Sequence, residues 1–364
     1  MIILGIESSC DETAAAVVED GHRILSSVVA SQTVIHRPYG GVVPELASRQ
    51  HVKVIIPVVS EALQRANLDL SAVDAIAVTQ GPGLVGSLLV GIGVAKGLAY
   101  ATGKPLVAVN HLEGHILAAF LEEAPPSFPV IALVVSGGHT NLYVVSNYSN
   151  LTLVGRTRDD AAGEAFDKVA KFLDLGYPGG VVIDELARSG NPSAISFPRA
   201  YLEKDSLDFS FSGIKTAVVN FVRKYVDFNE SGRSGISANN GVVTNQLPVQ
   251  VADIAASFQE AVVDVLVVKT CAAAQRFDAS QVVVAGGVAA NSRLRERLRE
   301  EVTRLGLPLM LPRAELCTDN AAMVAAAGFH QFNKTGGSWD LDFDAISRWP
   351  DLPASSPSTP LRTS

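Results

Sequence analysis

The sequence is poor in cysteine, aromatic residues and charge. Its three cysteines, Cys10, Cys271 and Cys317, lie far apart and form no C-x-x-C motif. This spacing argues against a disulfide framework or a zinc ribbon and favours a reducing compartment. Only 6% of the residues are aromatic and 18% are charged, so the core has to be built from Val, Ala, Leu and Ile packed close to glycine-rich turns. Such a composition is typical of an α/β enzyme.

We also expect no targeting or membrane segment. The N-terminal residues MIILGIESSC carry no basic stretch, and their apolar run is too short for a signal peptide. The most apolar segment, residues 83–101, contains Ser87, Lys96 and five glycines. It predicts a buried helix preceded by a turn rather than a membrane span. We therefore expect a cytoplasmic protein with no membrane partner.

No excess of positive charge is present to attract nucleic acid. The net charge is −8 and the pI is about 5.4, so an RNA substrate would need a local basic patch or a partner protein. The most basic stretch is RLRERLRE, residues 293–300. Its interleaved glutamates favour a solvated helix face that pairs with itself over an RNA-binding patch.

What the sequence does contain is one pattern that occurs twice. Residues 2–8 form a short apolar stretch, followed by the polar turn ESSCDET and a second apolar stretch. Residues 130–146 repeat this scheme around the turn SGGHT. Two such hairpins in a chain too long for one core suggest a duplicated domain with two lobes. Strands that alternate with helical patterns imply a largely parallel sheet in each lobe.

A later glycine turn extends this picture. Residues 281–302 show the pattern of a strand, a Gly-Gly turn and a helix. Such a turn exposes backbone N–H groups that favour phosphate or ribose binding, although any tight strand-to-helix turn can use glycine. Together with the two hairpins, the turn resembles the nucleotide cleft of actin, Hsp70 and the sugar kinases.

This resemblance predicts an α/β fold of two duplicated actin/Hsp70-like lobes with a nucleotide cleft between them. Prolines within residues 122–129 interrupt a helix and place the lobe boundary there. We expect an N-terminal lobe at 1–127, with about 320–345 packing back onto it, and a C-terminal lobe with inserted helices at 128–319. The latter should carry an exposed loop at 227–248, and a disordered tail should follow at 346–364.

Two histidines bracket the segment HLEGH, residues 111–115. On a helix, residues four apart lie on the same face with their Cβ atoms roughly 5–6 Å apart. His111 and His115 could therefore bind one small cation together. From the spacing alone, two imidazoles on the surface of a helix remain the alternative.

A family resemblance rests on nine strings that occur in a fixed order. Together they resemble the bacterial TsaD family of tRNA adenosine N(6)-threonylcarbamoyltransferases, over about residues 2 to 345. The strings are ESSCDETAAAVV, GPGLVGSLLVG, HLEGH, VSGGHT, AAGEAFDKVAK, YPGG, FSFSGIKTAV, AGGVAANSRLR and LCTDNAAM.

The resemblance implies a transfer reaction. The family moves a threonylcarbamoyl group from threonylcarbamoyl-AMP to N6 of the adenosine adjacent to the anticodon in tRNAs that read ANN codons. Its bacterial members work with the degenerate paralogue TsaB and the P-loop ATPase TsaE. We therefore expect threonylcarbamoyl-AMP, tRNA and these two proteins as partners.

The resemblance also implies one iron(II) or zinc ion. The family's ligands map onto His111, His115 and Asp319, a set that leaves coordination positions open for substrate oxygens. In zinc proteases of the H-E-x-x-H type the glutamate directly follows the first histidine. In the H-x-E-G-H order found here, Glu113 does not directly follow His111. We therefore interpret Glu113 as an acid that supports the site from outside the ligand set, or as a surface acid.

The family's substrate-binding positions map onto both sides of the predicted cleft. The loop after residue 133 would approach the phosphate through its glycine amides, and acidic residues would suit ribose hydroxyls. His139 is interpreted as either a packing residue or a ligand contact, and Asp167 as either a ligand contact or half of a solvated pair with Lys168. The mapped positions are Val134, Val135, Ser136, Gly137, Gly138, Asp167, Gly180, Asp184 and Asn291.

Transfer to an amine also requires a proton acceptor and a group that stabilises charge on the carbonyl oxygen. Asp11 and Glu12 in the first turn are the predicted catalytic residues. Alternatively, they only stabilise the hairpin through turn hydrogen bonds. Cys10 is adjacent, but the sequence shows no histidine nearby that would activate it as a nucleophile.

Three other functions compete with transfer. One is an ATP-dependent kinase or ATPase of the same superfold. The first strand carries Glu7, but the opposing turn SGGHT has no acid, which disfavours hydrolysis of magnesium-bound ATP. A nucleotide-binding scaffold resembling the degenerate paralogue would lack the two histidines and the aspartate. A metalloprotease is disfavoured by the order of residues in HLEGH.

Overall fold

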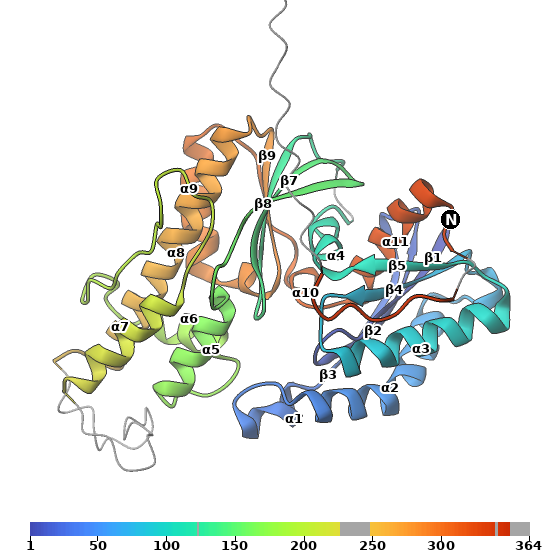
Figure 1. The fold of residues 1–364 in the computed structure, drawn as a ribbon, viewed down its shortest axis with the longest axis horizontal. Helices are drawn as coiled ribbons and strands as arrows, with labels where there is room; N and C mark the ends of the chain where they lie inside the picture. Colours follow the sequence, from blue (N-terminus) through green and yellow to red (C-terminus); the bar gives the residue numbers. More distant parts are fainter. Residues whose placement is uncertain (122–123, 226–247, 339–340, 350–364) are drawn as a thin grey trace, which may run out of the picture.

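The computed structural model describes residues 1–121, 124–225, 248–338 and 341–349. Two five-stranded sheets lie side by side, each covered by helices (Figure 1). They fall on either side of residues 127–128, the predicted lobe boundary. Except for Pro248, the loop predicted at 227–248 lies outside the described residues.

The first sheet has the strand order β3-β2-β1-β4-β5. Hairpins make β1, β2 and β3 antiparallel neighbours, whereas β4 and β5 run parallel to β1. The strands are β1 (Ile2–Glu7), β2 (Glu12–Glu19), β3 (Arg23–Ser31), β4 (Ala75–Gly81) and β5 (Leu106–Asn110).

The second sheet repeats this arrangement with the order β10-β9-β6-β7-β8. Here β6, β7 and β8 are antiparallel neighbours, and β9 and β10 are parallel to β6. The prediction of largely parallel sheets is thus wrong for the hairpins, because tight turns join only antiparallel strands. The strands are β6 (Val130–Val135), β7 (Thr140–Asn147), β8 (Asn150–Arg156), β9 (Gln281–Ala285) and β10 (Leu309–Met310).

Helices cover both faces of the first sheet. The long helices α2 and α3 pack on one face, and α11 packs on the other beside α4. The elements are α1 (Thr33–His36), η1 (Arg37–Tyr39), α2 (Pro44–Arg65), η2 (Leu70–Ala72), α3 (Val85–Thr102), α4 (His111–Ala118) and α11 (Ala321–Thr335).

The helices of the second lobe pack around α8, which runs through a large apolar core. They are α5 (Ala162–Phe172), α6 (Gly179–Ala187), α7 (Ser212–Arg223), α8 (Val251–Arg276), η4 (Gly287–Ala290), α9 (Ser292–Arg304) and α10 (Ala314–Cys317).

Helix α3 is the apolar segment for which a buried helix is predicted. Its inner face, including Leu88 and Ile92, is buried against the first sheet. Its outer face exposes Leu89 and Tyr100, which are 48% and 83% accessible, so the prediction is correct for one face only. Within the described ranges, α3 is the one helix whose length and composition would suffice to cross a membrane.

The C-terminal part of the chain returns to the first lobe. Helix α11 packs on the first sheet, and Ser338 pairs with Leu106 as an isolated bridge. The backbone N–H of Ile346 donates to the carbonyl of Gln80 at 2.8 Å, and Gly83 N–H donates to the carbonyl of Ser347 at 3.3 Å. Contact with the first lobe therefore extends into the predicted tail, whose residues from 350 lie outside the described ranges.

Candidate metal centre and active site

The two histidines lie on the first turns of α4, where the sequence starts a helix at Asn110. The Asn110 side chain accepts hydrogen bonds from the N–H groups of Leu112 and Glu113 at 2.8 and 3.2 Å. This N-cap fixes the position of the helix start. The rings of His111 and His115 then lie edge to face with centroids 4.7 Å apart, and both are buried. The predicted shared face is confirmed, and the alternative of a surface pair is wrong.

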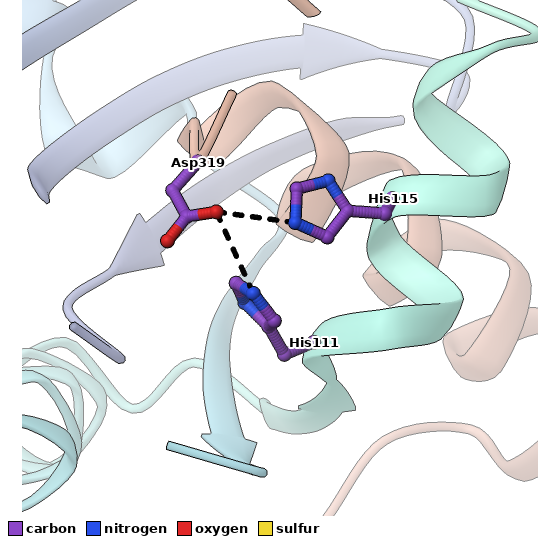
Figure 2. Close-up of side chains that lie close together, drawn as sticks. All are labelled: His111, His115 and Asp319. Carbon is purple, nitrogen blue, oxygen red and sulfur yellow. Dashed lines mark hydrogen bonds and ion pairs between the residues drawn. The ribbon is translucent and has the colours of Figure 1, made fainter. Parts of the chain in front are cut away.

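Asp319 reaches both rings from the segment between α10 and α11 (Figure 2). Its Oδ1 lies 3.1 Å from His115 Nε2 and 3.6 Å from His111 Nε2. The ligand atoms of the three residues all lie within 4.8 Å of one another. Two imidazoles and one carboxylate at this spacing suit zinc or iron and leave coordination positions for other oxygens.

Glu7 orients the first histidine and was not predicted to do so. Its Oε2 lies 3.1 Å from His111 Nδ1, and it also accepts a hydrogen bond from Thr79 at 2.6 Å. With Nδ1–H donating to a carboxylate, the Nε2 lone pair of His111 faces Asp319 and is available to a metal. Such carboxylate–histidine pairs are usual behind metal ligands. The signal in the sequence is a single acid at the end of an otherwise apolar strand.

Electrostatics make this cluster attractive to a cation. Burial alone would lower the pKa of His111, yet the carboxylates of Asp319 and Glu7 raise this pKa to about 9. Burial would conversely raise the pKa of Asp319, but the histidines hold it well below the usual range. Two buried carboxylates thus stabilise positive charge at the rings, and a metal ion can supply that charge.

The predicted catalytic acids lie in the turn between β1 and β2. Glu12 Oε1 accepts a hydrogen bond from Ser31 at 2.9 Å, whereas its Oε2 is buried and has no partner among the described residues. Burial, opposed by the bond to Ser31 and assisted by Asp11, raises the pKa of Glu12 to about 7. Burial also raises the pKa of Asp11. A carboxylate with an unused oxygen and this pKa is suited to accept a proton near neutrality.

A buried histidine supports this turn from α2. His51 Nε2 lies 2.9 Å from the carbonyl of Cys10, and its Nδ1 lies 2.7 Å from Thr13 Oγ1. Burial lowers the pKa of His51, so a neutral ring donates to the turn and accepts from Thr13. Burial and the neighbouring acids raise the pKa of Cys10 well above its usual range, which argues further against a thiolate nucleophile.

The predicted phosphate loop follows β6. Gly163 N–H donates to the carbonyl of Ser136, and a Cβ at Gly163 would lie 2.5 Å from that oxygen. Gly286, with φ +90°, approaches the loop from the other side, where a Cβ would lie 2.5 Å from the carbonyl of Val135. Gly137 and Gly138 would meet nothing within 4 Å. Val134, Val135 and Ser136 are thus held between two glycines, while the tip remains open to a ligand.

Asp167 and Gly180 lie together at the contact of α5 and α6. Asp167 Oδ1 accepts a hydrogen bond from Gly179 N–H at 2.7 Å. Lys168 instead forms ion pairs with Asp160 and Glu164, so the alternative of a solvated Asp167–Lys168 pair is wrong. Burial raises the pKa of Asp167, and Asp11 adds to the effect.

Asp184 and Asn291 meet at the start of α9. Asp184 Oδ1 accepts a hydrogen bond from Ser292 Oγ at 2.8 Å. Asn291 caps α9 through Leu294 N–H at 2.9 Å and donates to Gln259 at 2.8 Å. Both residues thus stabilise the strand-to-helix turn, and a role in binding the nucleoside stays a prediction.

His139 brings the second hairpin close to the metal centre. Burial, followed by the electrostatic effect of the neighbouring His111 and His115, lowers the pKa of His139 to about 4. The ring is therefore neutral at pH 7. These electrostatic effects place the hairpin that carries the phosphate loop near the three predicted metal ligands.

Solved structures share this architecture. Full-length HypF, solved in a phosphate- and nucleotide-bound form, aligns with a TM-score of 0.59 at 12% identity, covering 93% of this chain and 47% of HypF. Component A of the (R)-2-hydroxyglutaryl-CoA dehydratase from Acidaminococcus fermentans aligns with a TM-score of 0.51 at 18% identity, covering 91% of this chain and 98% of that protein. These similarities confirm the predicted two-lobed fold class.

Comparison of sequences identifies the family. The model of TsaD, described as tRNA N6-adenosine threonylcarbamoyltransferase, matches residues 23–326. A protein of that name from Syntrophobacter fumaroxidans is 58% identical over 350 residues, 96% of this chain and 100% of the relative. Another from Syntrophus aciditrophicus is 55% identical over 96% of this chain and 98% of the relative. The chain belongs to the tRNA N6-adenosine threonylcarbamoyltransferase family.

Proposed function

We propose that this protein transfers a threonylcarbamoyl group to N6 of an adenosine in tRNA. The observation that carries the proposal is the cluster of His111, His115 and Asp319, in which Glu7 orients His111, near the hairpin with the open glycines 137 and 138. Family membership over nearly the whole chain agrees with it. The acceptor would be the adenosine adjacent to the anticodon in tRNAs that read ANN codons.

The donor would be threonylcarbamoyl-AMP, a mixed anhydride. Gly137 and Gly138 are exposed and carry no side chain that would keep an anion from their backbone, which suits its phosphate. Asp167 and Gly180 on one wall, with Asp184 and Asn291 beside the Gly-Gly turn, suit the nucleoside part. Binding there would direct the carbamoyl carbon toward the first lobe, where the acids and histidines lie.

Proton transfer falls to the first hairpin. The N6 amine attacks the carbamoyl carbon, a C–N bond forms, the C–O bond to the phosphate breaks, and AMP leaves with the electron pair. The proton lost by the amine goes to the unpartnered Oε2 of Glu12. Asp11, next in the turn, positions the amine by accepting a hydrogen bond from it.

His111, His115 and Asp319 would hold one iron(II) or zinc ion. When bound, the ion supplies a Lewis acid for an oxygen of the substrate. Glu7 keeps the Nε2 atom of His111 directed at that position through its contact with Nδ1. Both histidine rings are buried, whereas the side chain of Asp319 is 21% exposed.

The other functions fit less well. A magnesium-dependent kinase or ATPase would be served by acids on both hairpins, but the second hairpin has none, and Glu7 is occupied by His111 and Thr79. A scaffold has no need of three converging ligands. A metalloprotease would lack its base, because Glu113 is not adjacent to His111 and interacts electrostatically with Lys334 instead.

The partner proteins of the transferase would be the degenerate paralogue TsaB and the ATPase TsaE.

The proposal is tested by incubating the protein with threonylcarbamoyl-AMP and unmodified tRNA, with and without these partners. Digestion to nucleosides and mass spectrometry should reveal threonylcarbamoyladenosine. The variant H111A should yield none, whereas H22A, which removes an exposed histidine, should match the wild type. Absence of the modified nucleoside with all partners present would refute the assignment.

A further inference from the structure

The most basic stretch of the sequence does not provide an RNA-binding surface. Arg293 forms an ion pair with Glu260 at 2.6 Å, and Arg297 lies 3.5 Å from Asp264. Arg295 donates instead to backbone carbonyls, including that of Pro312 at 3.0 Å. The predicted self-pairing is confirmed for Arg293, which also lies 2.6 Å from Glu296, and for Arg297, which lies 3.9 Å from Glu301. The cations that meet RNA have to lie elsewhere.

A groove at the junction of the lobes offers such a place. It has a volume of about 900 Å³ and is lined by η1 of the first lobe and by α5 and the following turn of the second. These elements face each other across the lower part of the view in Figure 1. Arg37 and Tyr39 contribute from η1, and Lys171 and Tyr177 from the opposite wall. Lys171 Nζ lies 3.4 Å from the carbonyl of Tyr39, which joins the two walls.

The charge of this groove is less compensated than that of α9. In the part of the chain that the structure describes, neither Arg37 nor Lys171 forms an ion pair, and both are exposed. Lys168 lines the groove too, but Asp160 and Glu164 neutralise it.

One acid, Asp174, also lines the groove. The positive charges of Arg37 and Lys171 exceed the single negative charge of Asp174, so these three side chains together carry a net positive charge. In a protein with a net charge of −8, such a spot attracts a phosphate backbone locally.

Aromatic rings accompany these cations. The side chain of Tyr39 is 56% exposed and can present a face to a base. Tyr177 lies within electrostatic reach of the candidate active site, since burial and then the carboxylates of Asp11 and Asp167 raise the pKa of its phenol well above the usual range. Tyr177, which lines the groove, thus connects it electrostatically with the acids of the candidate site.

We propose that this groove holds the unpaired nucleotides that flank the reactive adenosine. Arg37 and Lys171 contact their phosphates, and Tyr39 stacks on a base. The inference rests on the proposed function and adds the acceptor's binding path to it. An adenosine whose N6 attacks a buried carbon must leave its stack, and its neighbours then need cationic and aromatic support. Exposed cations beside aromatic rings are the usual means of holding single-stranded nucleic acid.

The test measures RNA affinity separately from catalysis. Wild type, R37E, K171E and Y39A are titrated with a fluorescent anticodon stem-loop RNA over a range of salt concentrations, with R299E on exposed α9 as the charge-matched control. Loss of a phosphate contact should weaken binding and reduce the salt slope by about 1 in each of R37E and K171E. Y39A should weaken binding by roughly 5- to 100-fold, and Y39F should restore it. R299E should bind as the wild type does.

Steady-state assays then separate the two substrates. The groove variants should raise KM for tRNA while kcat and KM for the donor stay unchanged, with melting temperatures equal to that of the wild type. Unchanged RNA affinity in R37E and K171E, or an equal loss in R299E, would overturn the proposal. So would an equal loss of affinity for a fully duplex RNA. If the wild type modified no tRNA, the proposed function would fail, while the titrations would still decide whether the groove binds RNA.

Discussion

The two corresponding hairpins share one antiparallel strand arrangement and differ in the chemistry of their turns. In each, a buried strand leads through a short turn into an antiparallel partner, with Glu7 opposite Ala14 in one and Val135 opposite Thr140 in the other. The first turn carries Asp11 and Glu12, whereas the second has only small residues and a neutral histidine. The comparison shows that the two copies of one strand arrangement carry different functional groups, acids in the first turn and glycines in the second.

This difference follows from what each hairpin contacts. The first approaches α4, where Glu7 orients His111 and the turn adds proton-accepting carboxylates. The second is held by Gly163 and Gly286 and offers amides instead of charge. A site suited to a cation, with a base beside it, is thus paired with a loop suited to an anion. Each prediction below alters one hairpin, or the metal ligands beside it, and leaves the other in place.

The largest effect is expected from the metal ligands. H111A or D319A should bind no metal and lose about a thousandfold or more in kcat/KM, since a Lewis acid contributes several kcal/mol. Metal analysis by mass spectrometry and the tRNA modification assay check this. Retention of stoichiometric metal in both variants would exclude these side chains as ligands, and H22A serves as the control.

Removing the base of the first hairpin should have the next largest effect. E12Q should lose roughly 100-fold or more in kcat, as is usual for a general base. The kcat/KM of the wild type should rise as the pH passes about 7, where Glu12 loses its proton, and E12Q should lack this inflection. An unchanged pH profile in E12Q would assign the proton to another group.

The same carboxyl group should affect stability with a defined sign. The folded-state pKa of Glu12 is raised from 4.5 to about 7, so its protonated form is favoured in the folded protein. The contribution of Glu12 to the free energy of unfolding is therefore fully present below pH 4.5 and lost as the pH rises through about 7. Chemical denaturation of wild type and E12Q at several pH values should show a smaller loss in the variant. Parallel curves would contradict the buried environment of this carboxylate.

A smaller effect is expected from Glu7, which contacts the metal ligand His111. E7Q preserves size but removes the carboxylate charge that faces His111 Nδ1, which should lower metal affinity about 10- to 100-fold. Competition with a chelator measures this affinity. E113Q, on the same helix α4 but two residues from each histidine and therefore off their shared face, should leave this affinity unchanged.

The smallest effects should come from the second hairpin. G163A brings a methyl group to within 2.5 Å of the carbonyl of Ser136, so it should displace the loop, raise KM for the donor and destabilise the protein by about 1–3 kcal/mol. G137A meets nothing within 4 Å and should unfold as the wild type does. Equal melting curves for both variants would argue against a loop held by close packing.

The sequence predicted the parts of the site that depend on local spacing. Residues four apart on a helix had to share a face, and the glutamates of RLRERLRE had to pair with its arginines. It did not reveal Glu7 as the partner of His111, because the two residues meet only when β1 packs beside α4. Arg37 and Lys171 are likewise isolated in the sequence, and only the junction of the lobes brings them together.

The prediction of largely parallel sheets failed for a related reason. The alternation of strands and helices was recognised, but each duplicated unit begins with a hairpin whose strands must run antiparallel. The helix at 85–102 was taken as buried from its composition. The structure shows instead that one apolar face covers the sheet and the other is exposed.

Anomalous scattering from crystals of the purified protein, recorded at the iron and zinc edges, tests the metal centre most directly. A single peak within bonding distance of His111 Nε2, a nitrogen of His115 and a carboxylate oxygen of Asp319 is the expected result. Metal-replete crystals without such a peak, or with the ion bound elsewhere and activity retained in D319A, would contradict the account.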